Sequence, residues 1–577
     1  MKWTGRYEQY DAAAFRKDLI SGLIVGIIAI PLGMAFAIAS GVKPEYGIYT
    51  TIIAGILISL LGGSKFQIGG PTGAFIPILF AIVLQYGYEN LLIAGFLAGI
   101  ILVLMGVFKL GVLIKFIPRP VTTGFTAGIA VIIFSGQIVN FLGLTGTKKH
   151  ENFLPNMNEI LSHLASLNGY SVLTAAICLA AILISPRFLP KIPGSLVGLV
   201  LSSVIAALFF KGHVTTIGSS FGVIPSTLPH FHFPTITWDR VGTLIQPALA
   251  IALLGGIESL LSAVVADGMT GTRHNSNREL IGQGIANMVT PLFGGIPATG
   301  AIARTATNIK NGAVSPFSGI IHGIVVFLVL ILFAPYASDI PLASMAPILM
   351  MVAWNMSERK EFAHILQSRT SDSLVLLITF LLTVLTNLTT AVEVGLVLSI
   401  LLFVKRISEQ LKVVKVLPDS AHKSNKVKAY MVSEHHDCPQ FNIFTLEGPL
   451  FFGTASKFER SVMDMTPQKP NILLLRMSKV PYMDTTGEAR LVQLIKEMEK
   501  SGGVVLISGI QRQPMDIAKS TGLYSLIRED RFFAHTGEAI NHALTLMSPA
   551  KCRGCTHAAF RECESKSNFA ANEKVSL

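Results

Sequence analysis

Two apolar stretches of this chain are broken by glycine and proline, and both breaks leave backbone groups where an anion could bind. The first reads Gly-Gly-Pro-Thr-Gly over residues 69–73, and the second reads Gly-Gly-Ile-Pro-Ala-Thr-Gly over 294–300. Their prolines, Pro71 and Pro297, lie 297 − 71 = 226 residues apart. Because lipid cannot hydrogen-bond a free backbone group, a broken membrane helix implies a cavity lined by protein or water. Paired breaks in corresponding halves indicate the binding site of a membrane transporter.

Arg304 follows the second break directly and is the side chain best suited to a small anion. A guanidinium binds an oxyanion through two parallel hydrogen bonds, and a helix that starts at 300–305 adds free N–H groups and a positive dipole end. Residues 73–75 offer the same backbone groups after the first break. We therefore predict an anion site between two facing helix ends. The alternative is that Arg304 extends to the membrane interface.

Glu258 lies in the middle of the apolar stretch 250–266 without a basic neighbour. An ionisable group at membrane depth is expensive and is a functional hypothesis by default. We predict that Glu258 binds a coupling proton or sodium ion beside the anion, because burial favours the protonated form of a carboxyl group. The alternative is a pair with Arg304 that merely holds two helices together.

The composition indicates a membrane protein. The 577 residues are 51% hydrophobic and 14% charged, whereas soluble domains carry about 25% charged residues. Residues 19–108 contain only four charged side chains, Lys43, Glu45, Lys65 and Glu89. The net charge of +12 comes from basic residues between apolar stretches, as topology signals do, so we expect no nucleic-acid partner. Five cysteines give no disulfide framework, and the absence of a nucleophile–base arrangement or metal-hydrolase motif argues against an enzyme.

The elements that must position these residues are about fourteen membrane-spanning segments. They are expected to start near residues 19, 46, 72, 91, 118, 170, 193, 243, 279, 300, 314, 340, 371 and 389. Basic residues favour both termini in the cytoplasm. The loops predicted inside hold Lys109, Lys115, Arg119, Arg187, Lys191, Arg273, Arg278, Arg359 and Lys360, and the outside exceptions are Lys148, Lys149, Lys211 and Arg240.

The two halves of the membrane region are predicted to be an inverted repeat. The first segment has Ile30-Pro31 at its middle and the eighth has Ile257-Glu258, an offset of 258 − 31 = 227 that nearly equals the offset of the breaks. Seven segments are an odd number, so the second half would enter the membrane upside down, as in many secondary transporters. The alternative is chance similarity between apolar segments.

The composition becomes that of a soluble domain after Arg406. We predict a cytoplasmic segment over 1–18, a membrane region over 19–406, a charged linker over 407–439, an α/β domain over 440–548 and a disordered tail over 549–577. The tail contains Cys552, Cys555, His557 and Cys563, which could bind zinc. Their spacing is not that of a standard finger, so we favour a loose tail with free thiols over a zinc site.

Four stretches together resemble the SulP anion transporters, the bacterial relatives of solute carrier family 26. They are Asp18–Ala37, Gly69–Phe75 (GGPTGAF), Gly300–Asn308 (GAIARTATN) and Val480–Gly487 (VPYMDTTG), and the last resembles the signature of a STAS domain. The resemblance covers residues 12–548. It implies a polytopic α-helical fold of seven plus seven segments with core and gate domains, elevator-like motion, usually a dimer, and a cytoplasmic STAS domain.

The resemblance also implies site residues. The predicted anion-binding residues are Thr72, Gly73, Ala74, Phe75, Gly300, Ala301, Ile302, Ala303 and Arg304. The stretch 256–284 resembles the sodium-coupled bicarbonate branch, in which an Asp and a Thr stand where this chain has Glu258 and Ser262. There they help to hold sodium with backbone near Gly300 and Ala301. The changes leave sodium or a proton as the coupling ion, and Leu32 stands where many relatives have Gln.

The stretch that resembles the STAS signature contains a candidate regulatory site at Asp484, Thr485 and Thr486. In soluble STAS proteins a Ser after the matching Asp is phosphorylated, and here Thr485 and Thr486 follow Asp484. We favour a hydroxyl that caps the helix start. The STAS domain is also a candidate site for a cytosolic protein partner.

We therefore expect cation-coupled secondary transport of sulfate, bicarbonate or a dicarboxylate across a bacterial cytoplasmic membrane, with no cofactor besides coupling Na⁺ or H⁺. The alternatives are a nucleobase carrier on the same fold, a passive anion channel, and a membrane-anchored STAS regulator.

Overall fold

The computed structural model describes residues 10–112, 118–150, 152–189, 192–227, 231–386, 388–418, 427–428, 432, 437–465, 470–552, 555, 559–560 and 563. They fall into two compact units, Met1–Ser399 and Ile400–Leu577. The predicted zinc ligand His557 lies outside the described residues.

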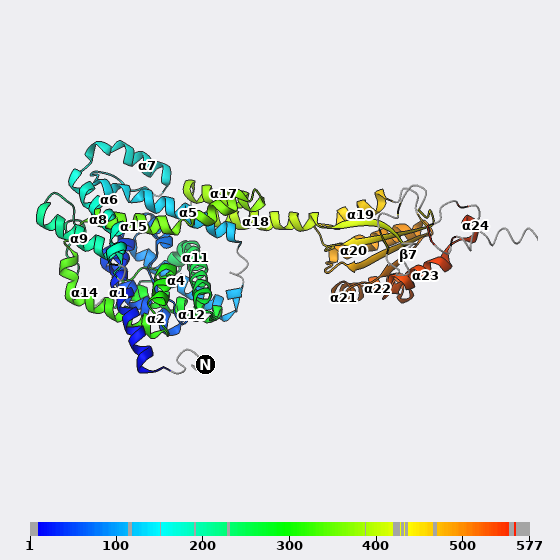
Figure 1. The fold of residues 1–577 in the computed structure, drawn as a ribbon, viewed down its shortest axis with the longest axis horizontal. Coiled ribbons are helices and arrows are strands. Elements are labelled where there is room, and N and C mark those ends of the chain that lie inside the picture. Colours follow the sequence, from blue (N-terminus) through cyan, green and yellow to red (C-terminus); the bar gives the residue numbers. More distant parts are fainter. Residues whose placement is uncertain are drawn as a thin grey trace, which may run out of the picture. The chain divides into compact units, whose positions relative to one another are not determined.

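The first unit is built from apolar helices, as the composition predicts (Figure 1). Within the described residues, seven helices are long and apolar enough to cross a membrane. Each expected start is matched by a helix or half-helix that begins close to it. The segments are α1 (Ala12–Ala39), α2 (Pro44–Leu61), η1 with α3 (Gly73–Phe75 and Ile76–Tyr86), α4 (Tyr88–Val107), α5 (Arg119–Gly136), α8 (Gly169–Phe188), α9 (Gly194–Phe209), α11 (Trp238–Thr270), α12 (Ser276–Val289), α13 (Ile302–Lys310), α14 (Phe317–Ala337), α15 (Leu342–Met356), α17 (Ser371–Leu385) and α18 (Leu388–Glu409).

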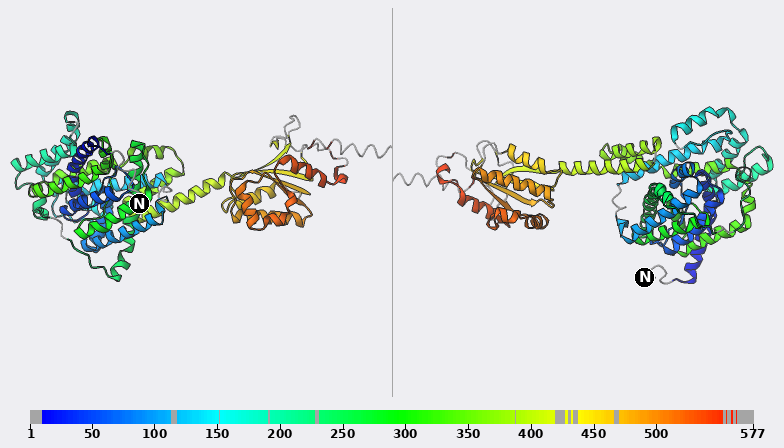
Figure 2. Two further views of the ribbon diagram at one scale, coloured as in Figure 1. Left: turned by 90° about the horizontal axis from the view of Figure 1, so that it is seen from below. Right: turned by 180° about the vertical axis from the view of Figure 1, so that it is seen from behind.

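Short elements join these segments. They are α6 (Ile138–Leu142), α7 (Phe153–Ser162), η3 (Leu164–Ser166), α10 (Ile217–Phe221), η4 (Thr290–Phe293) and α16 (Arg359–Gln367). Helices from the two halves pack side by side: α14 lies along α1, α12 lies along α4, and α17 lies along α5 (Figures 1 and 2). Each half of the sequence thus contributes helices to the same packed layers, which is the arrangement that an intertwined repeat requires.

The two breaks are extended and pair with each other. Strand β1 (Gly69–Gly70) lies antiparallel to strand β2 (Thr299–Gly300), with Gly69 opposite Gly300 and Gly70 opposite Thr299. Extended backbone is tolerated at membrane depth here because each strand satisfies the other's polar groups. The strands correspond at an offset of 299 − 69 = 230, four more than the offset of the prolines, because Pro71 follows its strand whereas Pro297 precedes its own.

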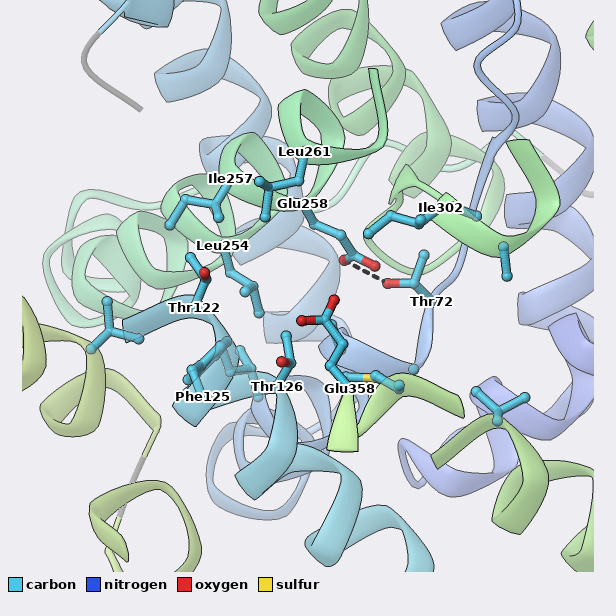
Figure 3. A pocket seen from close by; sticks show the side chains of 18 of the residues that line it. Thr72, Thr122, Phe125, Thr126, Leu254, Ile257, Glu258, Leu261, Ile302 and Glu358 are labelled. Carbon is cyan, nitrogen blue, oxygen red and sulfur yellow. Dashed lines mark hydrogen bonds between the residues drawn. The ribbon is translucent and has the colours of Figure 1, made fainter. Parts of the chain in front are cut away.

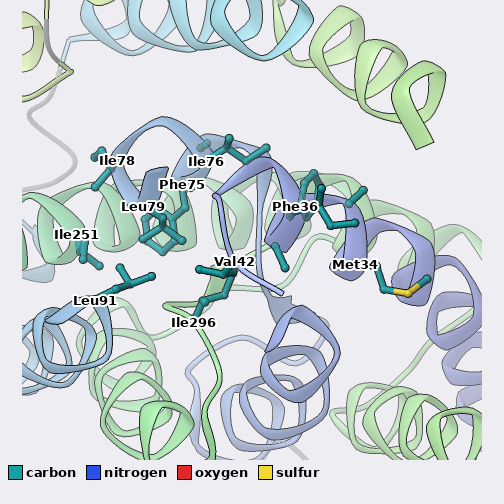
Figure 4. Close-up of a cluster of buried hydrophobic side chains, with 14 of the residues drawn as sticks. Met34, Phe36, Val42, Phe75, Ile76, Ile78, Leu79, Leu91, Ile251 and Ile296 are labelled. Atoms are coloured by element: carbon teal, nitrogen blue, oxygen red, sulfur yellow. The ribbon is translucent and has the colours of Figure 1, made fainter. Parts of the chain in front are cut away.

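Buried apolar side chains fill the space around the breaks (Figure 4). Phe75, Leu79, Leu91 and Ile251 are among them and come from four different elements. Large apolar side chains also cover the outer surface, for example Phe209 and Leu332, which are 73% and 64% exposed. In a soluble protein such a surface would aggregate, whereas lipid covers it in a membrane protein.

The second unit contains a six-stranded sheet in the order β4-β3-β5-β6-β7-β8, in which β5 to β8 are parallel and β3 is antiparallel to β5. Strand alternation sends Leu473 and Leu475 into one apolar cluster and Ile472 and Leu474 into another. The strands are β3 (Lys412–Pro418), β4 (Val427–Lys428), β5 (Phe441–Glu447), β6 (Ile472–Lys479), β7 (Val504–Ser508) and β8 (Phe532–Phe533), and the helices are α19 (Ala455–Asp464), α20 (Thr485–Lys500), α21 (Arg512–Ser520), α22 (Leu523–Ile527), η6 (Glu529–Arg531), α23 (Thr536–Leu546) and α24 (Pro549–Cys552).

Both boundaries of the second unit differ from those predicted from the sequence. Helix α18 continues to Glu409, and the expected linker 407–439 supplies strand β3. The expected tail 549–577 supplies Phe560, whose ring stacks on Phe441 of β5 with 5.1 Å between centroids. Charged neighbours lower the average hydropathy of both stretches, and an average over a window hides the few apolar residues that reach the core.

Candidate functional site

A cavity of about 340 Å³ lies where the two breaks meet (Figure 3). Half-helices η1 with α3 and α13 both begin at this cavity, and α11 and α5 form its other walls. Of the predicted anion-binding residues, it is lined by Thr72, Gly73, Ala74, Ala301, Ile302, Ala303 and Arg304. The structure therefore brings the two predicted helix ends together at one cavity.

Backbone hydrogen bonds hold the two half-helices in register. The N–H of Ala301 donates to the carbonyl of Ile68 at 2.8 Å, and the N–H of Ile68 donates to the hydroxyl of Thr305 at 3.0 Å. These bonds continue the β1–β2 ladder into the first turn of α13. Free N–H groups at the starts of both half-helices then give the cavity a positive electrostatic potential, which favours an anion.

Arg304 is 3% exposed and lines the cavity. Its Nη2 donates to the carbonyl of Pro71 in the opposite break, and its Nη1 has no partner among the described residues. Gly70 lies against this guanidinium, since a Cβ at position 70 would be 2.7 Å from Nη1. A buried cation with an unused donor beside a cavity is suited to receive an anionic ligand. The alternative of an arginine at the membrane interface does not agree with this burial.

Glu258 also lines the cavity, on α11. Its Oε2 accepts a hydrogen bond from the hydroxyl of Thr72 at 2.9 Å (Figure 3). Among the described residues, no ion pair within 4.0 Å joins Glu258 to Arg304. The carboxyl and the guanidinium thus face one cavity without neutralising each other directly, which leaves each able to bind a ligand of opposite charge.

Three predicted site residues lie outside the cavity lining. Phe75 is 1% exposed and packs in the core beside Leu79 (Figure 4). It points away because η1 is a tight 3₁₀ turn that directs Gly73 and Ala74, but not the third residue, toward the cavity.

The other two belong to a buried polar network. The Ser262 hydroxyl donates to Thr305 at 3.3 Å, and the Gly300 N–H donates to the Ser259 hydroxyl at 3.1 Å. Of the predicted coupling-ion residues, Glu258 and Ala301 line the cavity and Ser262 and Gly300 do not.

Several polar residues of the cavity were not predicted from the sequence. They are Thr122 and Thr126 on α5, Asn355 on α15, Glu358 and Glu393. Glu358 has a positive φ of 43°, and its carboxylate points into the cavity (Figure 3). It stands beside Arg359 and Lys360 in the sequence, where a carboxylate is indistinguishable from an ordinary loop residue. A non-glycine residue at positive φ is a signal that only the structure gives.

The predicted regulatory loop of the second unit is the start of α20. Asp484, not a threonine hydroxyl, caps this helix by accepting from the Gly487 N–H at 2.8 Å. Its other oxygen accepts from the Phe452 N–H at 3.0 Å. Thr485 and Thr486 are exposed first-turn residues, so the expectation that their hydroxyls cap the helix is wrong. A carboxylate accepts these N–H groups more strongly than a hydroxyl does.

No metal-binding group of three or more His, Cys, Asp or Glu side chains is found in the part of the chain that the structure describes. Cys552, Cys555 and Cys563 form no disulfide within that part of the chain. Burial raises the pKa of the Cys438 thiol to about 11.

The fold and site define a class of protein, namely a multi-pass membrane transporter for anions that carries a STAS domain. Residues 15–379 match the Sulfate permease family, and residues 430–539 match the STAS domain. The chain belongs to the Sulfate permease family, whose members are transporters and not enzymes.

Relatives and solved structures agree with this assignment. The chain is 55% identical over 93% of its length to the "Putative sulfate transporter YvdB" of Bacillus subtilis, of which it covers 99%. It is 30% identical over 94% of its length to the "Bicarbonate transporter BicA" of Picosynechococcus, of which it covers 97%. Its fold is similar to that of murine Slc26a9, with a TM-score of 0.84 at 19% identity over 94% of this chain and 93% of that one.

Proposed function

We propose that this protein is a cation-coupled secondary transporter of a small oxyanion. The observation that carries the proposal is Arg304, a buried guanidinium with an unused donor at a cavity where two half-helices begin. Sulfate is the leading candidate because of the relative named as a sulfate transporter, and bicarbonate is the second because of BicA. A dicarboxylate is the third.

The proposed division of roles follows the geometry. Arg304 and the N–H groups at 73–74 and 302–303 bind the anion, and Glu258 binds H⁺ or Na⁺. Glu258 and Arg304 line the same cavity. A cation bound at Glu258 removes repulsion toward the incoming anion, and the anion in turn favours the bound cation, so that the coupling is reciprocal.

We also propose that the cavity faces the cytoplasm. Val121 and Glu358 line it, and both adjoin loops whose basic residues predict the cytoplasmic side. We propose that the structure represents an inward-open state of an elevator-type cycle, in a bacterial cytoplasmic membrane with both termini inside. A homodimer is part of the same proposal.

The test is an uptake panel in proteoliposomes containing labelled sulfate, bicarbonate, a dicarboxylate and uracil, with imposed sodium or proton gradients. We expect uptake of one oxyanion that a gradient accelerates. Uracil uptake would instead support a nucleobase carrier, gradient-independent conductance would support a channel, and no transport at all would support a regulator.

A further inference from the structure

A second cavity, of about 80 Å³, lies along the same helices as the first. Early residues of α5, such as Phe125, line the site cavity, and later residues, such as Ile132, line the second cavity. Helix α3 contributes Ile78 to the first cavity, whereas Ile76, Pro77 and Phe80 line the second. The two cavities therefore lie at successive levels along α5 and on different faces of α3.

Ile133 lies next to the linings of both cavities. Ile133 lines the second cavity and is 2% exposed. Its Cδ1 is also 3.5 Å from the position of a Cβ on Gly73, a residue that lines the site cavity. The barrier between the cavities at this point is thus about one side chain thick.

The second cavity carries an unpaired lysine. Lys149 lines it, and its Nζ lies 5.9 Å from the centroid of the Phe80 ring. No carboxylate within 4.0 Å of Lys149 occurs among the described residues. Glu159 lines the same cavity, and its carboxylate accepts from the Lys148 N–H at 3.1 Å and contacts the His150 ring at 3.3 Å. Glu159 thereby fixes the loop that presents Lys149.

The positions of Lys148 and Lys149 also depart from the predicted distribution of basic residues across the membrane. Lys148 and Lys149 are exceptions among the loops that the distribution of basic residues predicts to be outside. A basic residue that opposes the topology signal and lines a cavity is better explained by attraction of an anion than by membrane orientation.

We infer that the second cavity is the outer vestibule for the transported anion, in which Lys149 attracts the anion from outside and Ile133 closes its passage to Arg304. The inference rests on the proposed function, because it assigns the second end of the same transport route. The ligand class is a small inorganic or organic oxyanion.

The test compares Lys149→Gln with Lys149→Arg and with Lys211→Gln in right-side-out vesicles that take up the anion found in the panel. Lys211→Gln removes the same charge from another loop predicted outside, at a residue that does not line the cavity. A charge pair about 4 Å apart in water contributes ~1 kcal/mol. We therefore expect Lys149→Gln to raise the external KM about five-fold for a monovalent anion and more for a divalent one, with Vmax unchanged.

Lys149→Arg and Lys211→Gln should keep the wild-type KM. Added salt should raise the KM of the wild type more than that of Lys149→Gln, because ions screen the lysine charge. Equal KM values for Lys149→Gln and Lys211→Gln would overturn the inference while leaving the proposed function standing. Absence of anion uptake by the wild type would instead refute the proposed function itself.

A second variant tests the barrier separately. Ile133→Ala should join the cavities and give anion leak that no longer follows the gradient, measured as efflux from preloaded vesicles. Wild-type efflux from folded Ile133→Ala protein would overturn the assignment of Ile133 as the closure.

Discussion

The first break brings a hydroxyl and backbone groups to the cavity, whereas the second brings a guanidinium. The Thr72 hydroxyl donates to the carboxylate of Glu258 on α11. The Arg304 guanidinium donates to the carbonyl of Pro71 in the first break. The half-helices also differ in character, since α3 reads IPILFAIVLQY and α13 reads IARTATNIK. The repeat therefore preserves a backbone arrangement, and the side chains added to it divide the binding of anion and cation between the halves.

Arg304→Gln should have the largest effect, because it removes the charge that only the second break supplies. A hydrogen bond to a charged group contributes roughly 1.5–3 kcal/mol, so we expect initial uptake rates to fall roughly 10- to 100-fold. Arg240, which is half-buried and does not line the cavity, is changed to Gln as the control. Wild-type rates in Arg304→Gln proteoliposomes would show that the two breaks do not differ in this way.

Glu258→Gln should come next, because it removes the proposed cation site but leaves the anion site in place. The acceleration of uptake by a sodium or proton gradient, roughly ten-fold for a coupling of about 1.4 kcal/mol, should disappear while uncoupled uptake remains. Glu89→Gln, at the start of α4, is the matched control. Unchanged gradient dependence would remove Glu258 from the mechanism.

Gly70→Ala should disturb the second break through the first. Gly70 has a φ of 149°, and an added Cβ would press on Arg304 Nη1. Strain of about 1–3 kcal/mol is expected in this backbone region, so uptake should fall about ten-fold. Gly242→Ala, where nothing lies within 4 Å of the new Cβ, should behave as wild type. If both alanines are equally harmless, the contact does not position Arg304.

Thr72→Val and Thr299→Val should give the smallest effects and the sharpest comparison. Each threonine precedes the final glycine of its break, but the Thr299 hydroxyl donates to the Gly255 carbonyl at 3.0 Å, whereas the Thr72 hydroxyl donates to Glu258. We expect Thr72→Val to change gradient dependence a few-fold, and Thr299→Val to lower thermal stability by about 1 kcal/mol without altering coupling. Uptake assays and thermal unfolding in detergent measure the two outcomes, and the reverse pattern would contradict the assigned roles.

Much of the architecture followed from the sequence because membrane segments leave strong signals. Arg304 and Glu258 were recognisable because charge is rare in apolar stretches, and the breaks because glycine and proline interrupt helices. Side-chain direction at a 3₁₀ turn has no comparable signal, so Phe75 was placed in the site although it packs in the core. Glu358 lies in a polar loop, where a carboxylate is common and does not indicate a binding site.

The pairing of Gly69 with Gly300 has a consequence for biosynthesis. The ribosome must add 300 − 69 = 231 further residues before the partner strand exists. At roughly 5–20 residues per second this takes on the order of 10–50 s. During that interval the nascent first half holds an unmatched stretch of backbone at bilayer depth, which makes it a natural client for the insertion machinery until its counterpart arrives.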